Sequence, residues 1–239
     1  MLEAKSLYKR FGNRSVVRGV DLSVRSGETV GLLGPNGAGK TTCFYMTAGF
    51  LKPDQGSVHL DGRDITSVPM HKRAMMGLIY LPQEPSVFRR MTVRQNIITA
   101  LELRHVSKTE QNGLARTLLN EFGLSSLASQ RADTLSGGER RKVEIARALA
   151  TKPIFILLDE PFSGLDPLAV EDLKEVIAGL KQKGMGILLT DHNVWEALPL
   201  CDRASILNEG EVLVSGEPEE LAQSREARSA YLGQNFRLR

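Results

Sequence analysis

The chain has 239 residues, 41% of them hydrophobic, which is enough for one large domain or for a core with a smaller attached subdomain. Its 31 basic residues are scattered among 28 acidic ones and its formal net charge is +3, so it has no basic stripe of the kind that argues for nucleic-acid binding. We therefore predict no nucleic-acid partner.

The sequence predicts neither a secretory signal nor a membrane span. The opening stretch "MLEAKSLYKRFGNR" mixes charges from its third residue and lacks the apolar region that a signal needs. We expect the chain to stay in the compartment where it is made. The longest apolar runs, such as Ile154 to Leu158, are far shorter than the ~20 residues that cross a bilayer, so we expect any membrane association to be peripheral.

The two cysteines, Cys43 and Cys201, are isolated in the sequence. Neither belongs to a CxxC pair, so the pattern favours neither a disulfide framework nor a metal site. We expect both to be reduced thiols in the core.

The first third of the chain predicts two strands of different kinds. Residues 28–34 ("ETVGLLG") are a nearly continuous apolar run, typical of a parallel strand that is covered on both faces. Residues 57–62 ("SVHLDG") alternate, which predicts a strand with one exposed face and a turn.

The middle of the chain predicts helices rather than strands. Thr92 with Gln95, and Ser107 with Glu110, have the spacing of capping boxes. One apolar helical face is formed by Leu114, Leu118, Leu119 and Phe122. We expect an α-helical subdomain at residues 84–150, inserted into an α/β core that consists of residues 1–83 and 151–239.

The last third predicts a parallel crossover unit and a hairpin. The apolar runs 154–160 ("IFILLDE") and 186–192 ("GILLTDH") flank residues 168–184, whose apolar spacing predicts a helix. Residues 205–216 predict a hairpin that closes near Asn208 to Gly210. The final residues, 224–239, are mildly basic and predict a helix followed by a tail.

The stretch "GPNGAGKT" at Gly34 to Thr41 fits the phosphate-loop pattern, and it follows a predicted strand and precedes a predicted helix. Its glycines let backbone N–H groups close around phosphate oxygens, Lys40 supplies a positive charge, and the Thr41 hydroxyl can ligate Mg²⁺. The predicted nucleotide-binding residues here are Gly34, Pro35, Asn36, Gly37, Ala38, Gly39, Lys40, Thr41 and Thr42.

Acidic and polar residues follow the predicted core strands. At the end of one strand, Asp159 is suited to hold the hydration shell of Mg²⁺, and Glu160 is suited to polarise an attacking water, a role worth ~10² to 10⁴ in rate. His192 ends another strand and can donate a hydrogen bond to a γ-phosphate, whereas Gln83 follows a strand-like run and could reach the metal or the water. Without the phosphate loop, each would be read as an ordinary polar residue at a strand end or in a loop.

A second serine-and-glycine turn opens a helix at "LSGGE". Ser136 and Glu139 match a capping box, but a cap needs no paired glycines. Gly137 and Gly138 would let an anion approach the helix N-terminus. Since the chain already has one phosphate loop for its own nucleotide, we expect this anion site to serve another molecule.

These motifs in this order, together with "SGLD" at Ser163 to Asp166, resemble the nucleotide-binding subunits of ABC transporters over essentially the whole chain. The resemblance implies an α/β fold of the P-loop NTPase type, with a RecA-like core, an antiparallel β subdomain and an inserted α-helical subdomain. It also implies that ATP and Mg²⁺ bind. Two copies would face each other head to tail, with Ser136, Gly137 and Gly138 on the γ-phosphate of the other copy's ATP.

The resemblance assigns three more roles. Asp166 belongs to the loop that couples the two sites, Gln83 relays the nucleotide state to membrane subunits, and Phe11 stacks on adenine. Phe11 replaces a tyrosine that is often found there, but stacking needs only the aromatic face. Glu139 replaces the commoner glutamine after the paired glycines and keeps the capping role.

The stretches "TTCFYMTAG", "YLPQEPSVFRRMTV", "LTDHNV" and "AYLGQNFRL" resemble a narrower family, the ATPases of lipopolysaccharide-export transporters of Gram-negative bacteria. This resemblance implies peripheral association with the cytoplasmic face of the inner membrane and two integral membrane permease subunits as partners. Phe88 and Arg89 would line the groove that receives the coupling helices of those subunits.

Other functions remain open at this point. The ATPases of branched-chain amino-acid importers share the "AYLG" type of ending, although "TDHNV" and "FYM" favour export. A soluble ABC-type ATPase switch in DNA repair or translation usually has two fused units or a coiled-coil insertion, and this chain shows neither. A P-loop kinase or GTPase needs no "LSGGE", and no "NKxD" motif is present.

Overall fold

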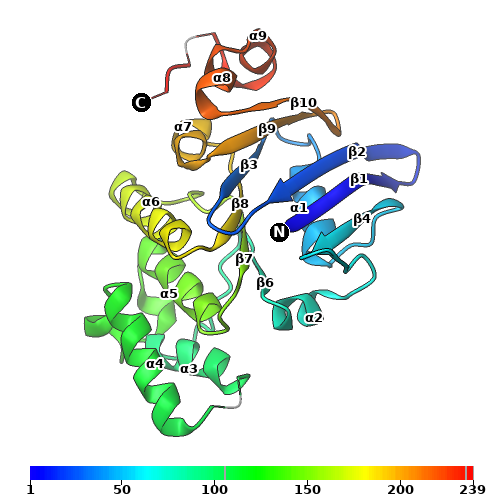
Figure 1. Cartoon of the computed structure of the whole chain (residues 1–239). Helices are drawn as coiled ribbons and strands as arrows, with labels where there is room; N and C mark the ends of the chain where they lie inside the picture. Colours follow the sequence, from blue (N-terminus) through cyan, green and yellow to red (C-terminus); the bar gives the residue numbers. More distant parts are fainter. Residues whose placement is uncertain (105, 235, 239) are drawn as a thin grey trace.

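The computed structural model describes residues 1–104, 106–234 and 236–238 of the chain. Helix α1 (Lys40–Ala48) packs between two β-sheets, and a group of helices lies beyond the far face of the larger sheet (Figure 1). This is the α/β architecture that the sequence predicts.

The larger sheet has the strand order β10-β9-β3-β8-β7-β6. The five strands from β9 to β6 pair in parallel, and β10 pairs with β9 as an antiparallel hairpin. This arrangement confirms the three predicted core strands and the predicted hairpin. The bounds are β3 (Thr29–Leu33), β6 (Leu78–Leu81), β7 (Phe155–Asp159), β8 (Gly186–Thr190), β9 (Arg203–Asn208) and β10 (Glu211–Gly216).

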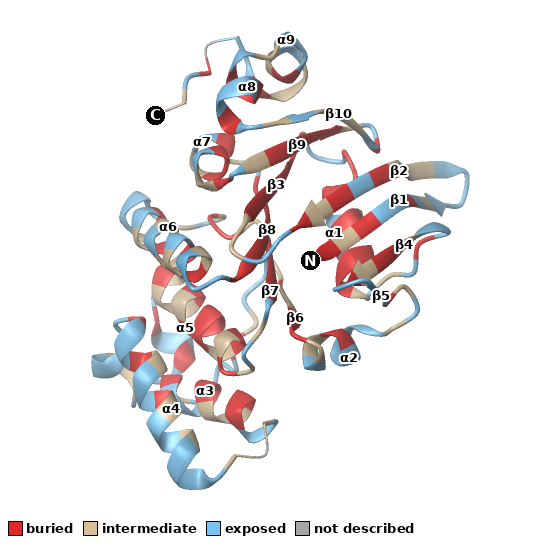
Figure 2. Cartoon of the chain, in the orientation of Figure 1, coloured by how far each residue is buried: buried red, intermediate tan, exposed pale blue. Residues whose placement is uncertain are grey.

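Both faces of the larger sheet are covered, which explains the unbroken apolar runs. In β7, Phe155 and Leu157 enter the cluster around α1, whereas Ile156 and Leu158 enter the cluster under the helices on the other face. All four side chains are fully buried (Figure 2). A strand with two buried faces has no polar face, so its sequence does not alternate.

The smaller sheet is antiparallel, with the order β2-β1-β4-β5. Its strands are β1 (Leu2–Phe11), β2 (Arg14–Val24), β4 (Gln55–Leu60) and β5 (Arg63–Asp64). The sequence predicted β4 but not β1 or β2. In β1 the alternation set by Leu2 and Ala4 is interrupted by a bulge at Ser6, whose φ is +48°, before burial resumes at Leu7.

Helices fill the middle of the chain: α2 (Met70–Met75), α3 (Val93–Glu102), α4 (Lys108–Glu121), α5 (Gly137–Leu149), and the short 3₁₀ turns Ser125–Leu127 and Ala132–Thr134. The capping boxes predicted at Thr92 and at Ser136 are confirmed. At Ser107 only half of the box forms, because its hydroxyl accepts from the N–H of Glu110 without the reciprocal bond.

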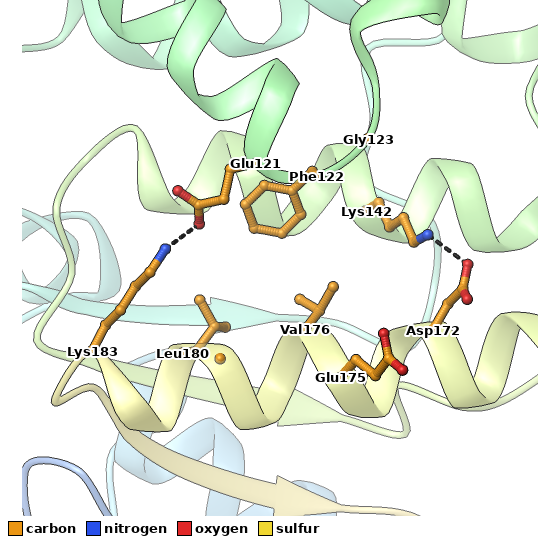
Figure 3. Close-up of a pocket in the computed structure, with 10 residues that line it drawn as sticks. Glu121, Phe122, Gly123, Lys142, Asp172, Glu175, Val176, Leu180 and Lys183 are labelled. Atoms are coloured by element: carbon orange, nitrogen blue, oxygen red, sulfur yellow. Dashed lines mark hydrogen bonds and ion pairs between the residues drawn. The ribbon is translucent and has the colours of Figure 1, made fainter.

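Two ion pairs connect the middle helices to α6 (Pro167–Gln182). Lys183, just after α6, pairs with Glu121 at the end of α4, and Lys142 on α5 pairs with Asp172 on α6 (Figure 3). Phe122 lies between the two pairs and faces α6. Ion pairs that are this exposed to solvent contribute at most ~1 kcal/mol each to the stability of the fold. Apolar packing is therefore the main interaction between these helices.

The C-terminal part consists of α7 (Val194–Ala197), the 3₁₀ turn Leu198–Leu200, α8 (Pro218–Gln223), α9 (Arg225–Ala227) and a π-helical turn, Arg228–Leu232. The predicted helix and irregular tail are confirmed, and Phe236 of the tail is 1% exposed and packs on the ring of Trp195 with 4.3 Å between ring centroids. Asn235 and Arg239, which also fell in the predicted tail, lie outside the described residues.

No helix within the described parts of the chain combines the length and the apolar character that crossing a bilayer requires.

The cysteines are expected to resist alkylation in the native protein. Both are free and buried, and burial raises the pKa of each thiol to about 12, which leaves a thiolate fraction of about 10⁻⁴ at pH 8. Intact-mass analysis after N-ethylmaleimide treatment should show no adduct on the folded chain and labelling of both cysteines after denaturation. A Met75→Cys variant is the positive control, because Met75 is 87% exposed. Rapid labelling of native Cys43 or Cys201 would contradict the buried assignment.

Candidate functional site

Four loops meet at one edge of the larger sheet because their strands run parallel. The carboxyl end of β3 continues into the loop that begins at Gly34, and that of β6 leads into the loop with Gln83. β7 ends at Asp159, and β8 is followed by His192 two residues later. Ligands of open α/β sheets bind at this kind of edge.

The glycine-rich loop wraps around the ammonium group of Lys40. Lys40 Nζ donates to the carbonyl oxygens of Gly34 at 2.7 Å and Pro35 at 3.0 Å, and the side chain is buried. Burial lowers the pKa of Lys40, and the negative charges of Glu160, Asp159 and Asp191 oppose that effect. The ammonium therefore has an anionic neighbourhood and a set of loop carbonyls that a phosphate could replace as its partner.

Gly34 is required by the backbone at this turn. Its φ is +146°, and a Cβ there would lie 2.1 Å from the carbonyl oxygen of Leu207 on β9. The next turn opens α1, where Thr41 is exposed and Thr42 is half-buried. The hydroxyl of Thr41 is thus accessible at the helix N-terminus.

A cavity of about 600 Å³ lies beside this loop. The loop contributes residues 35–38 to its lining, and the β1–β2 hairpin contributes residues 13–16 and Arg18. No motif marks Arg14 and Arg18, so the sequence analysis missed them. Phe11, the predicted adenine platform, is 52% exposed at the end of β1 and pairs with Arg14 across the hairpin.

The structure brings Gln83, Glu160 and His192 together around one carboxylate oxygen. Gln83 Nε2 donates to Glu160 Oε2 at 2.7 Å, and His192 Nδ1 lies 3.2 Å from the same oxygen. The backbone of Glu160 is also unusual, with φ of +45° and its N–H bonded to the carbonyl oxygen of Thr190 at 2.8 Å. Strain of this kind gathers at functional sites.

The contact between His192 and Glu160 constrains which proton the histidine can donate. If the neutral ring donates its Nδ1 proton to Glu160, its Nε2 is an acceptor and cannot donate to a phosphate. A phosphate contact through Nε2 therefore requires either a doubly protonated ring or a ring released from Glu160.

Asp191, which the sequence analysis did not single out, joins two of the loops. Its fully buried carboxylate accepts from the backbone N–H of Phe162 at 3.0 Å and of Asn193 at 2.8 Å. Burial raises the pKa of Asp191, and these two hydrogen bonds oppose the rise. The hydroxyl of Tyr231 donates to the carbonyl oxygens of Asp191 and His192, so the C-terminal segment supports the same loop.

The donor set near Asp159 suits Mg²⁺ bound together with a phosphate ligand. Asp159 is buried, and its Oδ2 accepts from the hydroxyl of Tyr80 at 2.9 Å, which leaves Oδ1 for a further contact. Burial raises the pKa of Asp159, with Tyr80 and Lys40 acting against the rise. Within the described residues, no group of three His, Cys, Asp or Glu side chains could hold a metal alone. Mg²⁺ needs few protein ligands when phosphates and waters supply the rest.

The predicted second anion site lies on the other side of the sheet from α1. Helix α5, which Ser136 caps, packs into the cluster under the helices, whereas α1 packs into the opposite cluster. None of Ser136, Gly137 and Gly138 is among the described residues that line the 600 Å³ cavity.

Gly138 has an additional reason to lack a side chain. A Cβ at Gly138 would lie 2.7 Å from the Cβ of Ala169 on α6. The glycine is therefore needed for the close approach of α5 and α6, which the sequence argument from anion access did not include.

Asp166, expected in a coupling loop, caps helix α6. Its carboxylate accepts from the N–H of Ala169 at 3.0 Å, and its side chain is exposed. The cap fixes where the loop ends and the helix begins.

Phe88 lines a second cavity, of about 330 Å³, between β6, α3 and α5. The side chain is 46% exposed, and the guanidinium of Arg147 lies 5.0 Å from its ring centroid. Arg147 also donates to the carbonyl and hydroxyl oxygens of Ser86, so the loop before Phe88 is attached to α5. Arg89 is exposed but is not among the described residues that line this cavity.

The chain is similar to known proteins along its whole length. The family described as "ABC transporter" matches residues 17–163. The lipopolysaccharide export system ATP-binding protein LptB of Acidithiobacillus ferridurans is 52% identical over 238 residues, which cover 100% of this chain and 99% of that protein.

Solved structures show the same fold. The ATP-binding cassette MJ1267 in its ADP conformation has a TM-score of 0.87 and 28% identity, and the match covers 98% of this chain and 99% of that one. A dimeric post-hydrolysis structure of the cassette MJ0796, bound to ADP and phosphate, has a TM-score of 0.80 and 25% identity over 91% of this chain and 99% of that one.

An Asp191→Ala variant is expected to hydrolyse ATP about 10- to 100-fold more slowly, because the N–H groups of Phe162 and Asn193 lose their acceptor and both loops can shift. Steady-state phosphate release measures the turnover, and calorimetric titration measures the affinity for the nucleotide. The affinity should change little. Asp191→Asn keeps one acceptor oxygen and should give an intermediate rate. Wild-type turnover in Asp191→Ala would show that the link between the two loops does not matter.

Proposed function

The chain belongs to the ABC transporter family as an ATP-binding subunit that hydrolyses ATP, and on that premise we propose that the transporter it drives exports lipopolysaccharide. The observation that carries this proposal is that similarity to the LptB protein extends over the whole chain, beyond the family match at residues 17–163. An importer of branched-chain amino acids is not favoured by such a relative.

The proposed nucleotide site combines the loop Gly34 to Thr42 with the edge of the larger sheet. The backbone N–H groups of the loop and the ammonium of Lys40 bind the phosphates, and Phe11 stacks on the adenine. Support comes from the cavity beside the loop and from the exposure of Phe11 next to it. Arg14 adds positive charge to the same cavity, whereas Arg18 is paired with Glu211.

Glu160 is the proposed general base for hydrolysis. A water attacks the γ-phosphorus, Glu160 takes its proton, and ADP leaves with the electrons of the broken P–O bond. Gln83 and His192 hold the carboxylate before the nucleotide arrives, as their shared contact with Oε2 indicates. Because a neutral His192 ring cannot donate both to Glu160 and to a phosphate, nucleotide binding releases the ring from Glu160.

The proposed Mg²⁺ ligands are the Thr41 hydroxyl, the Gln83 amide oxygen and, through the hydration shell, Asp159. When bound, Mg²⁺ neutralises charge that develops on the phosphate oxygens. Asp159 is buried at the end of β7, where its carboxylate lies at the edge of the sheet.

Subunits of this family work as dimers with membrane permease partners, and we propose that this chain forms a head-to-tail dimer with a second copy of itself. Ser136, Gly137 and Gly138 then bind the γ-phosphate of the partner's ATP. The first N–H groups of a helix have no intrahelical acceptor, so those of Gly137 and Gly138 can bind an anion. None of these three residues is among the described residues that line the 600 Å³ cavity beside the glycine-rich loop of their own copy, which supports assembly between copies.

The membrane partners are proposed to be two integral membrane permease subunits, with this chain on the cytoplasmic face of the inner membrane and no nucleic-acid partner. Phe88 contacts their coupling helices in the 330 Å³ cavity, the exposed Arg89 next to it in sequence contacts the same helices, and Asp166 connects the two nucleotide sites. We propose the division into a core of residues 1–83 and 151–239 and a helical subdomain of residues 84–150. Both parts line that cavity, which supports a coupling role.

Mixed dimers test the composite site. A dimer with Lys40→Ala in one copy and Ser136→Arg in the other carries both lesions in one composite site and should keep about half of the turnover if the sites are independent. The matched control carries both substitutions in the same copy, which damages both sites and should be nearly inactive. Equal activity of the two dimers in a phosphate-release assay would contradict head-to-tail assembly.

Co-purification tests the transport proposal. We expect tagged chain from gently solubilised native membranes to bring down the two lipopolysaccharide-export permeases, identified by mass spectrometry. Phe88→Ala should lose them while still binding ATP, because the ring lines the proposed coupling cavity. Leu213→Ala removes a side chain of similar exposure, 43% against 46%, and should retain them. Amino-acid permeases in the eluate would favour an importer, and no membrane partner would favour a soluble switch.

A further inference from the structure

Tyr80 on β6 reaches the carboxylate at the end of β7. Its hydroxyl donates to Asp159 Oδ2 at 2.9 Å. The parallel register pairs Tyr80 with Leu157, which is two residues before Asp159. Alternate residues of a strand share a face, so Leu157, Asp159 and the neighbouring Tyr80 all lie on the side of the sheet that α1 covers. The hydrogen bond follows directly from this register.

Two further aromatic rings hold Tyr80 in place. The ring of Tyr45 on α1 lies 5.9 Å from that of Tyr80, and the ring of Phe50 lies 5.3 Å away, both edge to face. Tyr45 and Phe50 also contact each other at 5.5 Å. Edge-to-face contacts at these distances are favourable, so the triad restricts the rotation of the phenol.

The chemistry of the phenol suits a fixed donor. A carboxylate oxygen only accepts hydrogen bonds, so the Tyr80 hydroxyl is the donor in this contact. It donates to one oxygen of the carboxylate, Oδ2. The other oxygen, Oδ1, then has a defined direction.

We infer that Tyr80 is a positioning residue that orients Asp159 toward Mg²⁺ bound with the nucleotide. The inference rests on the proposed role of Asp159 at the metal and goes beyond it, because no motif includes Tyr80. Hydrogen-bond partners of ligand groups of this kind typically change metal affinity 10- to 100-fold. Tyr80 is also one of the residues that line the cavity that contains Phe88.

The test compares the affinity for ADP with and without metal. Calorimetry on the purified full chain gives the dissociation constant of ADP in EDTA and in excess MgCl₂. The constant in EDTA divided by the constant in MgCl₂ measures the coupling between metal and nucleotide. Tyr80→Phe removes only the hydroxyl and keeps the ring triad. It should lower the ratio toward one, by about 10-fold or more, and leave the dissociation constant in EDTA unchanged.

Two controls separate positioning from general loss of structure. Tyr8→Phe removes a hydroxyl from the smaller sheet and should leave the ratio unchanged. Phe50→Ala removes a ring that is 51% exposed and should lower the ratio less than Tyr80→Phe does. In the Tyr80→Phe background, Phe50→Ala should have no further effect, because its influence passes through the phenol.

Asp159→Asn distinguishes failure of this inference from failure of the proposed metal role. If Asp159→Asn leaves the ratio at the wild-type value, the proposed role of Asp159 is wrong and the inference fails with it. If Asp159→Asn lowers the ratio but Tyr80→Phe does not, only the role of Tyr80 is overturned. An equal loss of ADP affinity in EDTA and in MgCl₂ would also overturn it, since that result reports a structural defect.

Discussion

Parallel pairing of β3, β8, β7 and β6 is the constraint on which the proposed nucleotide site depends. It brings the loops of Lys40, Gln83, Glu160 and His192 to one edge, although these residues are widely separated in the sequence. The register is strongly determined because both faces of the sheet are buried. A slip of one residue in β7 would exchange its side chains between the two apolar clusters and would move Asp159 and Glu160 to the wrong faces.

Local patterns predicted the parts of this site that local physics determines. The glycine-rich loop lies between an apolar run and a helix. The residues at the strand ends follow unbroken apolar runs, which are typical of strands that are buried on both faces of a sheet. The helix caps at Thr92 and Ser136 were also predictable, because a cap involves residues three apart.

Contacts between distant segments could not be predicted. Arg14 reaches the cavity through a hairpin whose first strand is irregular at Ser6, and Tyr231 supports the His192 loop from near the end of the chain. Gly138 looks like part of an anion site in sequence, yet its contact with Ala169 appears only when α5 packs on α6. In each case the sequence shows the residue but does not show which distant residue it will contact in the folded chain.

The strand order also affects how the protein is made. β3, which leads into the phosphate loop, pairs with β8 through Val30 and Leu188 and with β9 through Gly31 and Ala204. The ribosome therefore releases β3 long before β8 and β9 have been synthesised. Until then, β3 lacks the hydrogen-bonding partners that it has in the folded sheet. Such long-range pairing slows folding and exposes the nascent chain to aggregation. The sheet edge that the proposed nucleotide site requires is therefore complete only after β8 and β9 have been synthesised.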